Sequence, residues 1–265
     1  MEKQIFKRSK GLTDVSFSFC PGCTHGIIMR LIAESLEELD IIEETIGVSP
    51  VGCAGFCQNF FTCDFVGAAH GRAQAVGTGI KRSLPDKMVF TYQGDGDIAS
   101  IGTQHAIHTA ARGENITSIM VNNAIYGMTG GQMAPTTLEG MKTSTSPFGR
   151  DKALTGSPVD LPKLIANLEG AVYVASVSVD SPKNINIAKK AIKKAFMVQK
   201  AGLGFAFVSV LSTCPTNWGL SPAQSMQWLR DNMMPIYELG ELKVTEEVKS
   251  LWWIKWYLLD LADKE

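Results

Sequence analysis

Short apolar runs alternate with helix-like segments along most of this chain of 265 residues. The runs are rich in β-branched residues, and several are too continuously apolar for a strand with one solvated face. They occupy residues 46–51, 88–93, 116–122, 172–179 and 205–211. Helical periodicity is expected at 24–39, 71–84, 98–112, 161–168, 182–200 and 221–233. The alternation predicts an α/β fold, a mostly parallel open sheet with helices on both faces.

In such a sheet, ligands bind beyond the carboxyl ends of the strands. The longest loop that follows a strand, residues 123–160, is rich in Gly, Thr, Pro and Ser. Long irregular loops in compact domains are more often functional than idle. We therefore predict a ligand-binding domain at 1–240, followed by a C-terminal amphipathic helical tail at 241–265 that carries three Trp residues.

The charge balance excludes some classes of partner. Lys and Arg number 25 and Asp and Glu 26, with no basic stripe, so the sequence gives no argument for nucleic acid binding. No apolar stretch reaches the roughly 18 residues that a membrane span needs, and the N-terminus has no signal-peptide core. We expect a cytoplasmic protein that binds a small molecule or another protein.

Two strand-end loops carry a pattern typical of a phosphate and metal site. After one predicted strand comes GDGDIAS, in which Gly94 and Gly96 allow the backbone to approach a phosphate. Asp95 suits a phosphate only if Mg²⁺ lies between them, with further oxygen ligands from Asn123 and a loop carbonyl. The spacing of GDG and NN resembles the thiamine diphosphate motif. A simple turn and a dinucleotide site are the alternatives, but the latter needs a third glycine where Ile98 and Ala99 stand.

Four of the six cysteines are expected at the same edge of the sheet. Cys20 and Cys23 form a C-x-x-C pair before a predicted helix, while Cys53 and Cys214 each follow a predicted strand. The pair alone would suit a thioredoxin-like dithiol. Zinc could use all four thiolates, although structural zinc sites usually contain two such pairs. Convergence of the four favours an iron–sulfur cluster.

Several long motifs in a fixed order resemble one known family. They are CPGCTHG, GCAGF, HGRAQAVGTGIK, GDGD, NNAIYGMTGGQMAPTT and CPTNW. Over residues 18–239 the chain resembles the β, thiamine diphosphate-binding subunit of the 2-oxoacid:ferredoxin oxidoreductases. The resemblance implies a thiamine diphosphate-binding fold. It also implies oxidative decarboxylation of a 2-oxoacid to acyl-CoA and CO₂, with electrons passed through a 4Fe-4S cluster to ferredoxin.

The resemblance also implies site residues, which group by ligand. The cluster ligands are Cys20, Cys23, Cys53 and Cys214, and the Mg²⁺ ligands are Asp95, Asn123 and the carbonyl of Ile125. The residues implied at the cofactor are Gly52, Cys53, Ala54, His70, Gly94, Gly96, Asp97, Gly127, Met128 and Thr129. Cys57 and Cys63 fall outside the pattern, and we expect ordinary core or loop thiols there.

The family also implies a heteromeric complex. The partners are an α subunit, together with γ and ferredoxin-like δ subunits, and the acid that activates the aminopyrimidine ring belongs to the α subunit. We therefore assign no catalytic residue to this chain. A cluster-free thiamine-dependent decarboxylase or synthase and an electron-transfer or scaffold subunit with a vestigial cofactor loop stay open as alternatives.

The substrate prediction depends on two positions. Relatives that take 2-oxoglutarate tend to carry a lysine where Gly130 stands and a basic residue where Phe56 stands. Without cationic partners a buried distal carboxylate is disfavoured, whereas Phe56 and Met128 offer apolar surface. The sequence therefore predicts 2-oxoisovalerate as the preferred substrate, with 2-oxoglutarate as the runner-up.

Overall fold

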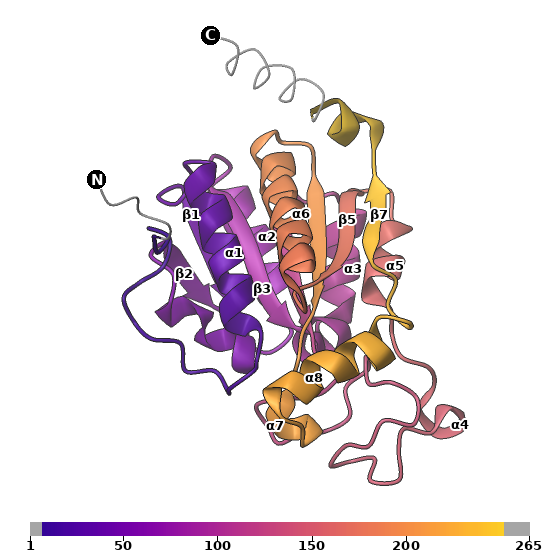
Figure 1. Ribbon diagram of the computed structural model, residues 1–265. Helices are drawn as coiled ribbons and strands as arrows, with labels where there is room; N and C mark the ends of the chain where they lie inside the picture. The colour runs from indigo at the N-terminus through magenta and orange to yellow at the C-terminus, as the bar shows by residue number, and fades with distance from the viewer. Residues whose placement is uncertain (1–6, 252–265) are drawn as a thin grey trace.

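Seven strands form one sheet with the order β2-β1-β3-β4-β6-β5-β7 (Figure 1). The structure, a computed structural model, describes residues 7–251. The strands are β1 (Thr45–Ser49), β2 (Asp64–Gly67), β3 (Met88–Gly94), β4 (Thr117–Asn122), β5 (Ala171–Ser178), β6 (Phe205–Leu211) and β7 (Gly240–Val244). The first six pair in parallel, and β7 pairs antiparallel with β5. The predicted mostly parallel sheet is confirmed.

The helices cover both faces of this sheet, as predicted (Figure 1). Their bounds are α1 (His25–Glu38), α2 (Ala73–Ser83), α3 (Thr103–Ala111), α4 (Lys152–Thr155), α5 (Leu161–Ala166), α6 (Pro182–Lys200), α7 (Pro215–Trp218) and α8 (Pro222–Trp228). Three further helical segments are not α-helical: η1 (Cys53–Asn59) is a 3₁₀-helix, and η2 (Asp97–Ile101) and η3 (Leu229–Met233) are π-helical. One apolar core lies between the sheet and α1 and α6, and a second lies under α2, α3 and α5.

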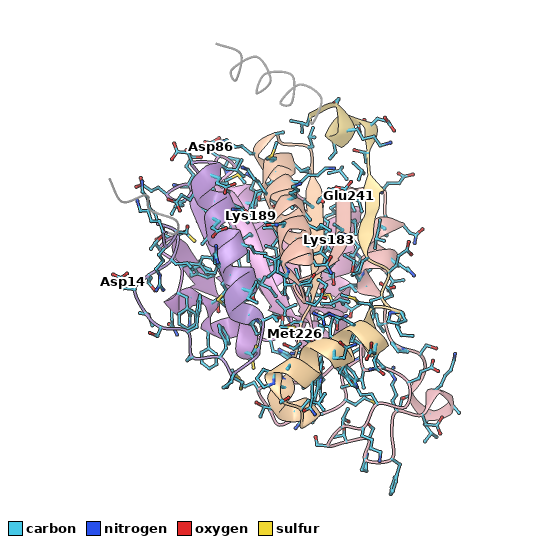
Figure 2. All side chains as sticks on the ribbon, in the orientation of Figure 1. Asp14, Asp86, Lys183, Lys189, Met226 and Glu241 are labelled. Atoms are coloured by element: carbon cyan, nitrogen blue, oxygen red, sulfur yellow. The ribbon has the colours of Figure 1, made fainter. Side chains whose placement is uncertain are left out.

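Helix α6 shows how the sequence sets these elements. The Ser181 side chain caps the helix by accepting a hydrogen bond from the backbone N–H of Asn184. Pro182 occupies the first turn, where a backbone N–H would have no partner inside the helix, so the missing N–H of proline costs nothing. The Nζ of Lys189 then lies 2.8 Å from a carboxylate oxygen of Glu34 and 2.7 Å from one of Glu38, both on α1. Figure 2 labels Lys189 at this junction. The pairs tie α6 to α1 on the same face of the sheet.

Two edge strands were missed by the sequence analysis. Strand β2 has four residues, of which three are exposed, so it has no continuous apolar run. Strand β7 carries Glu241, which is labelled in Figure 2. This side chain accepts hydrogen bonds from Lys194 at 2.8 Å and from the hydroxyl of Tyr173 at 3.1 Å. Edge strands need only one apolar face or none, which removes the pattern that identifies central strands.

The predicted helical tail at 241–265 is wrong at its start. Residues 241–244 belong to β7, because the pairing with β5 and the Glu241 contacts fix them in the sheet. Residues 246–251 are helical, and residues 252–265, with the three Trp, lie outside the described part of the chain.

The helix predicted at 98–112 is divided in two. Ser100 has non-helical φ and ψ of −113° and −107°, which separates η2 from α3. The reason is a close approach by the loop before α2. A Cβ on Gly71 would lie 2.5 Å from the Ile101 side chain, and one on Gly102 would lie 3.1 Å from the Gly71 carbonyl oxygen. Two glycines thus let the two loops pack backbone to backbone beside the end of β3.

The long loop at 123–160 is ordered around Arg150, which is 6% exposed. Its guanidinium donates to the carbonyls of Thr137 at 2.6 Å, Pro135 at 2.8 Å and Ser157 at 3.0 Å. The loop was predicted to be irregular, and the structure adds the short helix α4 within it. The hydrogen bonds hold the loop over the carboxyl ends of the strands, near α7 and α8 (Figure 1).

Candidate active site

A cavity of about 500 Å³ opens at the carboxyl ends of β1, β3 and β4. Every residue predicted to bind the diphosphate or Mg²⁺ lines it, although their role as ligands stays a prediction. These residues are Gly52, Cys53, Ala54, His70, Gly94, Asp95, Gly96, Asp97, Asn123, Ile125, Gly127, Met128 and Thr129. Val51, Tyr126, Gln132 and His25 complete the lining.

Asp95 follows β3 and is 2% exposed. Burial raises the pKa of its carboxyl to about 6, while hydrogen bonds from the Thr136 hydroxyl and the backbone N–H groups of Gly96 and Asn123 oppose that rise. All of these donors are neutral, and no Lys or Arg lines the cavity within residues 7–251. The carboxylate is held in place without a positive charge beside it. A bound cation would supply the missing charge.

Two asparagines shape the turn that follows β4. The Oδ1 of Asn122 accepts from the N–H of Ala124 at 3.1 Å, and Ala124 takes a left-handed φ of 59°. The Oδ1 of Asn123 accepts from the N–H of Ile125 at 3.2 Å. The turn brings the Tyr126 ring so close to Gly96 that a Cβ there would overlap it. Gly96 is therefore required for the two strand-end loops to meet.

The Asp97 carboxylate is turned toward the protein. It accepts from the side-chain amide of Gln93 at 2.5 Å and from the N–H of Gly71 at 2.9 Å. The Nδ1 of His70 also lies 2.7 Å from its Oδ1, an ion-pair distance, although the angle falls short of a hydrogen bond. Of the groups on Asp97, the backbone N–H is therefore the one suited to a diphosphate, since the carboxylate already fixes the His70 loop.

The four predicted cluster cysteines converge beside the cavity. A Cβ on Gly127 would lie 3.5 Å from the sulfurs of both Cys53 and Cys214, so these thiols flank one glycine. Burial raises the pKa of Cys23 to about 12, and the nearby thiols of Cys214, Cys53 and Cys20 raise it as well, against a hydrogen bond from the His25 backbone. The prediction that the four thiols share one edge of the sheet is confirmed.

Cys214 and Gly127 are held together by a residue that the sequence analysis missed. The Asn217 side-chain amide donates to the Cys214 sulfur at 3.2 Å and to the Gly127 carbonyl at 2.8 Å. All six cysteines are free. Cys57 lies fully buried in the apolar core, where burial raises the pKa of its thiol and Ser49 and Cys63 are its neighbours. It stands apart from the four.

In the part of the chain that the structure describes, no three Cys, His, Asp or Glu side chains are grouped tightly enough to hold one metal ion. The predicted Mg²⁺ site has only one carboxylate, and its other predicted ligands are an amide and a carbonyl. A four-iron cluster binds one thiolate at each iron, so its ligands stand farther apart than those of a single ion. The thiol arrangement is thus not that of a preformed single-ion site.

His25 is the lining residue that the sequence gave least reason to expect. The residue is 2% exposed, and its Nδ1 lies 2.6 Å from the hydroxyl of Tyr92. Burial lowers its pKa to about 4, so the imidazole is neutral at physiological pH. Tyr126, Gln132 and the Asp95 donor Thr136, by contrast, lie inside the long motif that starts at Asn122.

Comparison with known proteins identifies the family. The family described as "Thiamine pyrophosphate enzyme, C-terminal TPP binding domain" matches residues 50–210, which begin just after β1 and include β2 to β6 apart from the last residue of β6. The chain belongs to the thiamine pyrophosphate enzymes. The matched residues supply nearly all of the lining of the cavity, with His25 as the exception.

Within this family, the chain groups with subunits of 2-oxoacid oxidoreductases. It is 48% identical over 229 residues to ketoisovalerate oxidoreductase subunit VorA of Methanothermobacter thermautotrophicus, covering 86% of this chain and 48% of that protein. It is 39% identical over 234 residues to 2-oxoglutarate synthase subunit KorB of Methanocaldococcus jannaschii, covering 86% and 82%. The chain therefore spans about half the length of the ketoisovalerate relatives that it matches.

A solved structure has the same fold. It is the 2-oxoglutarate:ferredoxin oxidoreductase from Magnetococcus marinus, with 2-oxoglutarate, coenzyme A and succinyl-CoA bound. The TM-score is 0.73 at 27% identity, over 96% of this thiamine pyrophosphate enzyme and 91% of the matched chain. Separately, none of the helices within residues 7–251 has both the length and the apolar content to cross a bilayer.

Proposed function

We propose that this chain is the β subunit of a 2-oxoacid:ferredoxin oxidoreductase that converts a 2-oxoacid to acyl-CoA and CO₂. One observation carries the proposal. The same cavity receives the Asp95 and Asn123 loops on one side and the Cys53 thiol on another. A cluster-free decarboxylase would have no use for four thiols beside its cofactor, and a vestigial cofactor loop would have no use for a desolvated Asp95.

The lining residues fit Mg²⁺ and thiamine diphosphate. Asp95, the Asn123 side chain and the Ile125 carbonyl would hold the metal, which prefers oxygen ligands. Gly94 leaves open space against the backbone for the diphosphate, whereas Gly96 and Gly127 let the Tyr126 ring and the Cys53 and Cys214 sulfurs approach the two loops. Thiamine diphosphate would supply the electron sink that cleavage of a 2-oxoacid needs. The chain would hold this sink beside the thiols.

The converging thiols fit a 4Fe-4S cluster held by Cys20, Cys23, Cys53 and Cys214. Two hydrogen bonds support thiolates there: the Asn217 amide donates to Cys214, and the first backbone N–H of α1 donates to Cys23. The N-terminal end of a helix also favours negative charge. Such a cluster would carry single electrons to ferredoxin.

The active site is expected to be shared between subunits. We assign the ring-activating acid to an α subunit, and γ and ferredoxin-like δ subunits would complete a cytoplasmic complex that also binds coenzyme A. The role of this chain would be to bind and orient the cofactor and to hold the cluster against it. The domain at 1–240 would perform both tasks.

The substrate that we favour is 2-oxoisovalerate. The chain is more similar to the ketoisovalerate subunit than to the 2-oxoglutarate subunit described above. Met128 lines the cavity with 47% of its surface exposed, and no described Lys or Arg joins it there. Each methylene buried against such a surface contributes about 0.8 kcal/mol. The runner-up is 2-oxoglutarate, if a partner subunit provides the cation for its second carboxylate.

The test is anaerobic purification of the complex with its native partners, followed by kcat/KM for 2-oxoisovalerate, pyruvate and 2-oxoglutarate with ferredoxin or viologen as acceptor. We expect CoA-dependent activity that is highest with 2-oxoisovalerate, and none from the isolated, cluster-loaded chain. A complex without 2-oxoacid oxidation would overturn the function. A preference for 2-oxoglutarate would overturn the substrate alone, and an active isolated chain would overturn the shared site.

A further inference from the structure

His25 contacts both the thiols and the cofactor cavity. It is the first residue of α1, and its backbone N–H donates to the sulfur of Cys23. Its imidazole lines the cavity, together with Cys53 from the thiol side. Nothing in the resemblance assigns this histidine a role. Its position raises the question of what its ring offers to a ligand in the cavity.

The protein holds the imidazole on two sides. The ring stacks on Phe19 with centroids 4.9 Å apart and an angle of 22° between the planes. Its Nδ1 lies 2.6 Å from the hydroxyl of Tyr92, a β3 residue three positions before Asp95. No hydrogen bond among residues 7–251 uses Nε2, and this nitrogen is not one of the buried polar atoms that lack a partner. The Nε2 edge is therefore the one left to the cavity.

The Tyr92 hydroxyl decides which nitrogen carries the proton. It is fully buried and has no other hydrogen-bond partner in the described chain. If Nδ1 carried the proton and donated, the hydroxyl hydrogen would be buried without an acceptor, which is strongly disfavoured. The favoured arrangement has the hydroxyl donating to Nδ1, so the neutral ring carries its proton on Nε2.

We propose that His25 is a cofactor-binding residue whose Nε2–H donates a hydrogen bond to thiamine diphosphate, and that Tyr92 is the positioning residue that fixes this tautomer. The inference rests on the proposed function, because the ligand is the cofactor proposed there. It adds a donor to the cavity that Cys53 also lines. His25 would then contact the cofactor through its ring and Cys23 through its backbone N–H.

The test is calorimetric titration of the assembled complex, freed of cofactor with a chelator, with thiamine diphosphate at saturating Mg²⁺ and no substrate. His25→Phe keeps the ring stacking but removes the donor, and binding should weaken about tenfold to a hundredfold. His25→Gln restores an N–H near the Nε2 position and should bind within about threefold of wild type. Tyr92→Phe frees the tautomer and should weaken binding by a smaller factor than His25→Phe. His108→Phe, at an exposed position on α3, is the matched control and should bind like wild type.

A purely structural histidine gives the opposite order. Packing alone would leave His25→Phe closer to wild type than His25→Gln, and Tyr92→Phe unchanged; either result overturns the inference. If His25→Phe fails to fold, Tyr92→Phe decides, since unchanged binding there contradicts the tautomer argument and weaker binding supports it. A wild-type complex that binds no thiamine diphosphate would overturn the proposed function and this inference together, whereas equal binding by all variants would overturn only the role of His25.

Discussion

Each end of the sheet carries a buried carboxylate, and the two have opposite surroundings and oppositely shifted pKa values. At the amino ends, Glu114 is 8% exposed and accepts hydrogen bonds from Arg112 at 2.7 Å and from Arg82 at 2.5 Å. At the carboxyl ends, Asp95 is 2% exposed and has only neutral donors. Burial would raise the pKa of Glu114, but its two arginines outweigh that and lower it, whereas burial raises the pKa of Asp95 to about 6.

The difference separates stability from function. Glu114 is paired with Arg82 and Arg112, so it links α2, α3 and β4 without a ligand. Asp95 has no Lys or Arg beside it in the cavity lining of the described chain, and the thiols next to its loop also have pKa values raised by burial. A folded protein tolerates such groups where a ligand will complete them. The predictions below test this contrast, beginning with the largest expected effect.

The thiol group should show an all-or-none effect. Cys214→Ala removes a thiolate that Asn217 orients, and we expect loss of the visible absorption of the cluster and of electron transfer to ferredoxin. The matched control is Cys57→Ala, a cysteine buried in the apolar core, which should leave the absorption intact. Bleaching by Cys57→Ala, with a brown Cys214→Ala complex, would reverse the assignment.

The metal loop should show the next largest effect. Asp95→Ala removes the only carboxylate proposed as a Mg²⁺ ligand, and thiamine diphosphate affinity should fall by about a hundredfold or more, measured by calorimetry on the complex. Glu114→Ala removes a similarly buried carboxylate from the other end of the sheet. Its affinity for the cofactor should match that of wild type. Equal losses in the two variants would break the contrast between the ends.

The carboxylate at the amino ends of the strands, Glu114, should matter for stability rather than for cofactor binding. Glu114→Gln removes a charged acceptor of two arginines and should lower the free energy of unfolding at pH 7 by about 1 kcal/mol. The folded-state pKa of Glu114 lies below its usual 4.5, so its contribution is present above pH 4.5 and disappears as the pH falls through the lowered value. Urea unfolding at pH 7 and at pH 3 measures it. A difference that persists unchanged at pH 3 would contradict the ion-pair explanation.

Substrate choice should shift by the smallest factor. Gly130 has a φ of 104°, so a lysine at that position would strain the backbone of this loop. Met128→Lys adds the charge at the cavity rim without that strain. We expect kcat/KM for 2-oxoglutarate relative to 2-oxoisovalerate to rise about tenfold. Met128→Gln, which is polar but uncharged, is the control. A similar shift in both variants would show that charge is not the cause.

Much of the fold and the cavity could be predicted from the sequence. The five central strands are buried on both faces, and the cofactor loops follow them directly, so local pattern and sheet topology together locate residues such as Asp95 and Asn123. Strands β2 and β7 could not be predicted, because an edge strand has no such pattern. The break at Ser100 follows from the approach of Gly71, which is distant in sequence.

The partners of the site residues were harder to predict than the residues themselves. Thr136 reaches Asp95 across 41 positions, and His25 reaches Tyr92 across 67. Neither pairing leaves a local pattern, since each depends on how loops and helices pack in three dimensions. The inward turn of the Asp97 carboxylate has the same origin, because Gly71 and His70 come from another loop.

The most direct test of the contrast is the melting temperature of the complex with and without Mg²⁺ and thiamine diphosphate, for wild type and Asp95→Asn. Because the folded-state pKa of Asp95 is raised from 3.8 to about 6, its ionisation destabilises the ligand-free protein as the pH rises through that value. At pH 8 we expect ligand-free Asp95→Asn to be more stable than wild type by about 3 kcal/mol, with little difference near pH 4. The ligands should stabilise wild type strongly and Asp95→Asn hardly at all. A wild-type protein that gains nothing from the ligands, or an Asp95→Asn variant that gains as much, would contradict the claim that this carboxylate is kept unpaired for a metal and its cofactor.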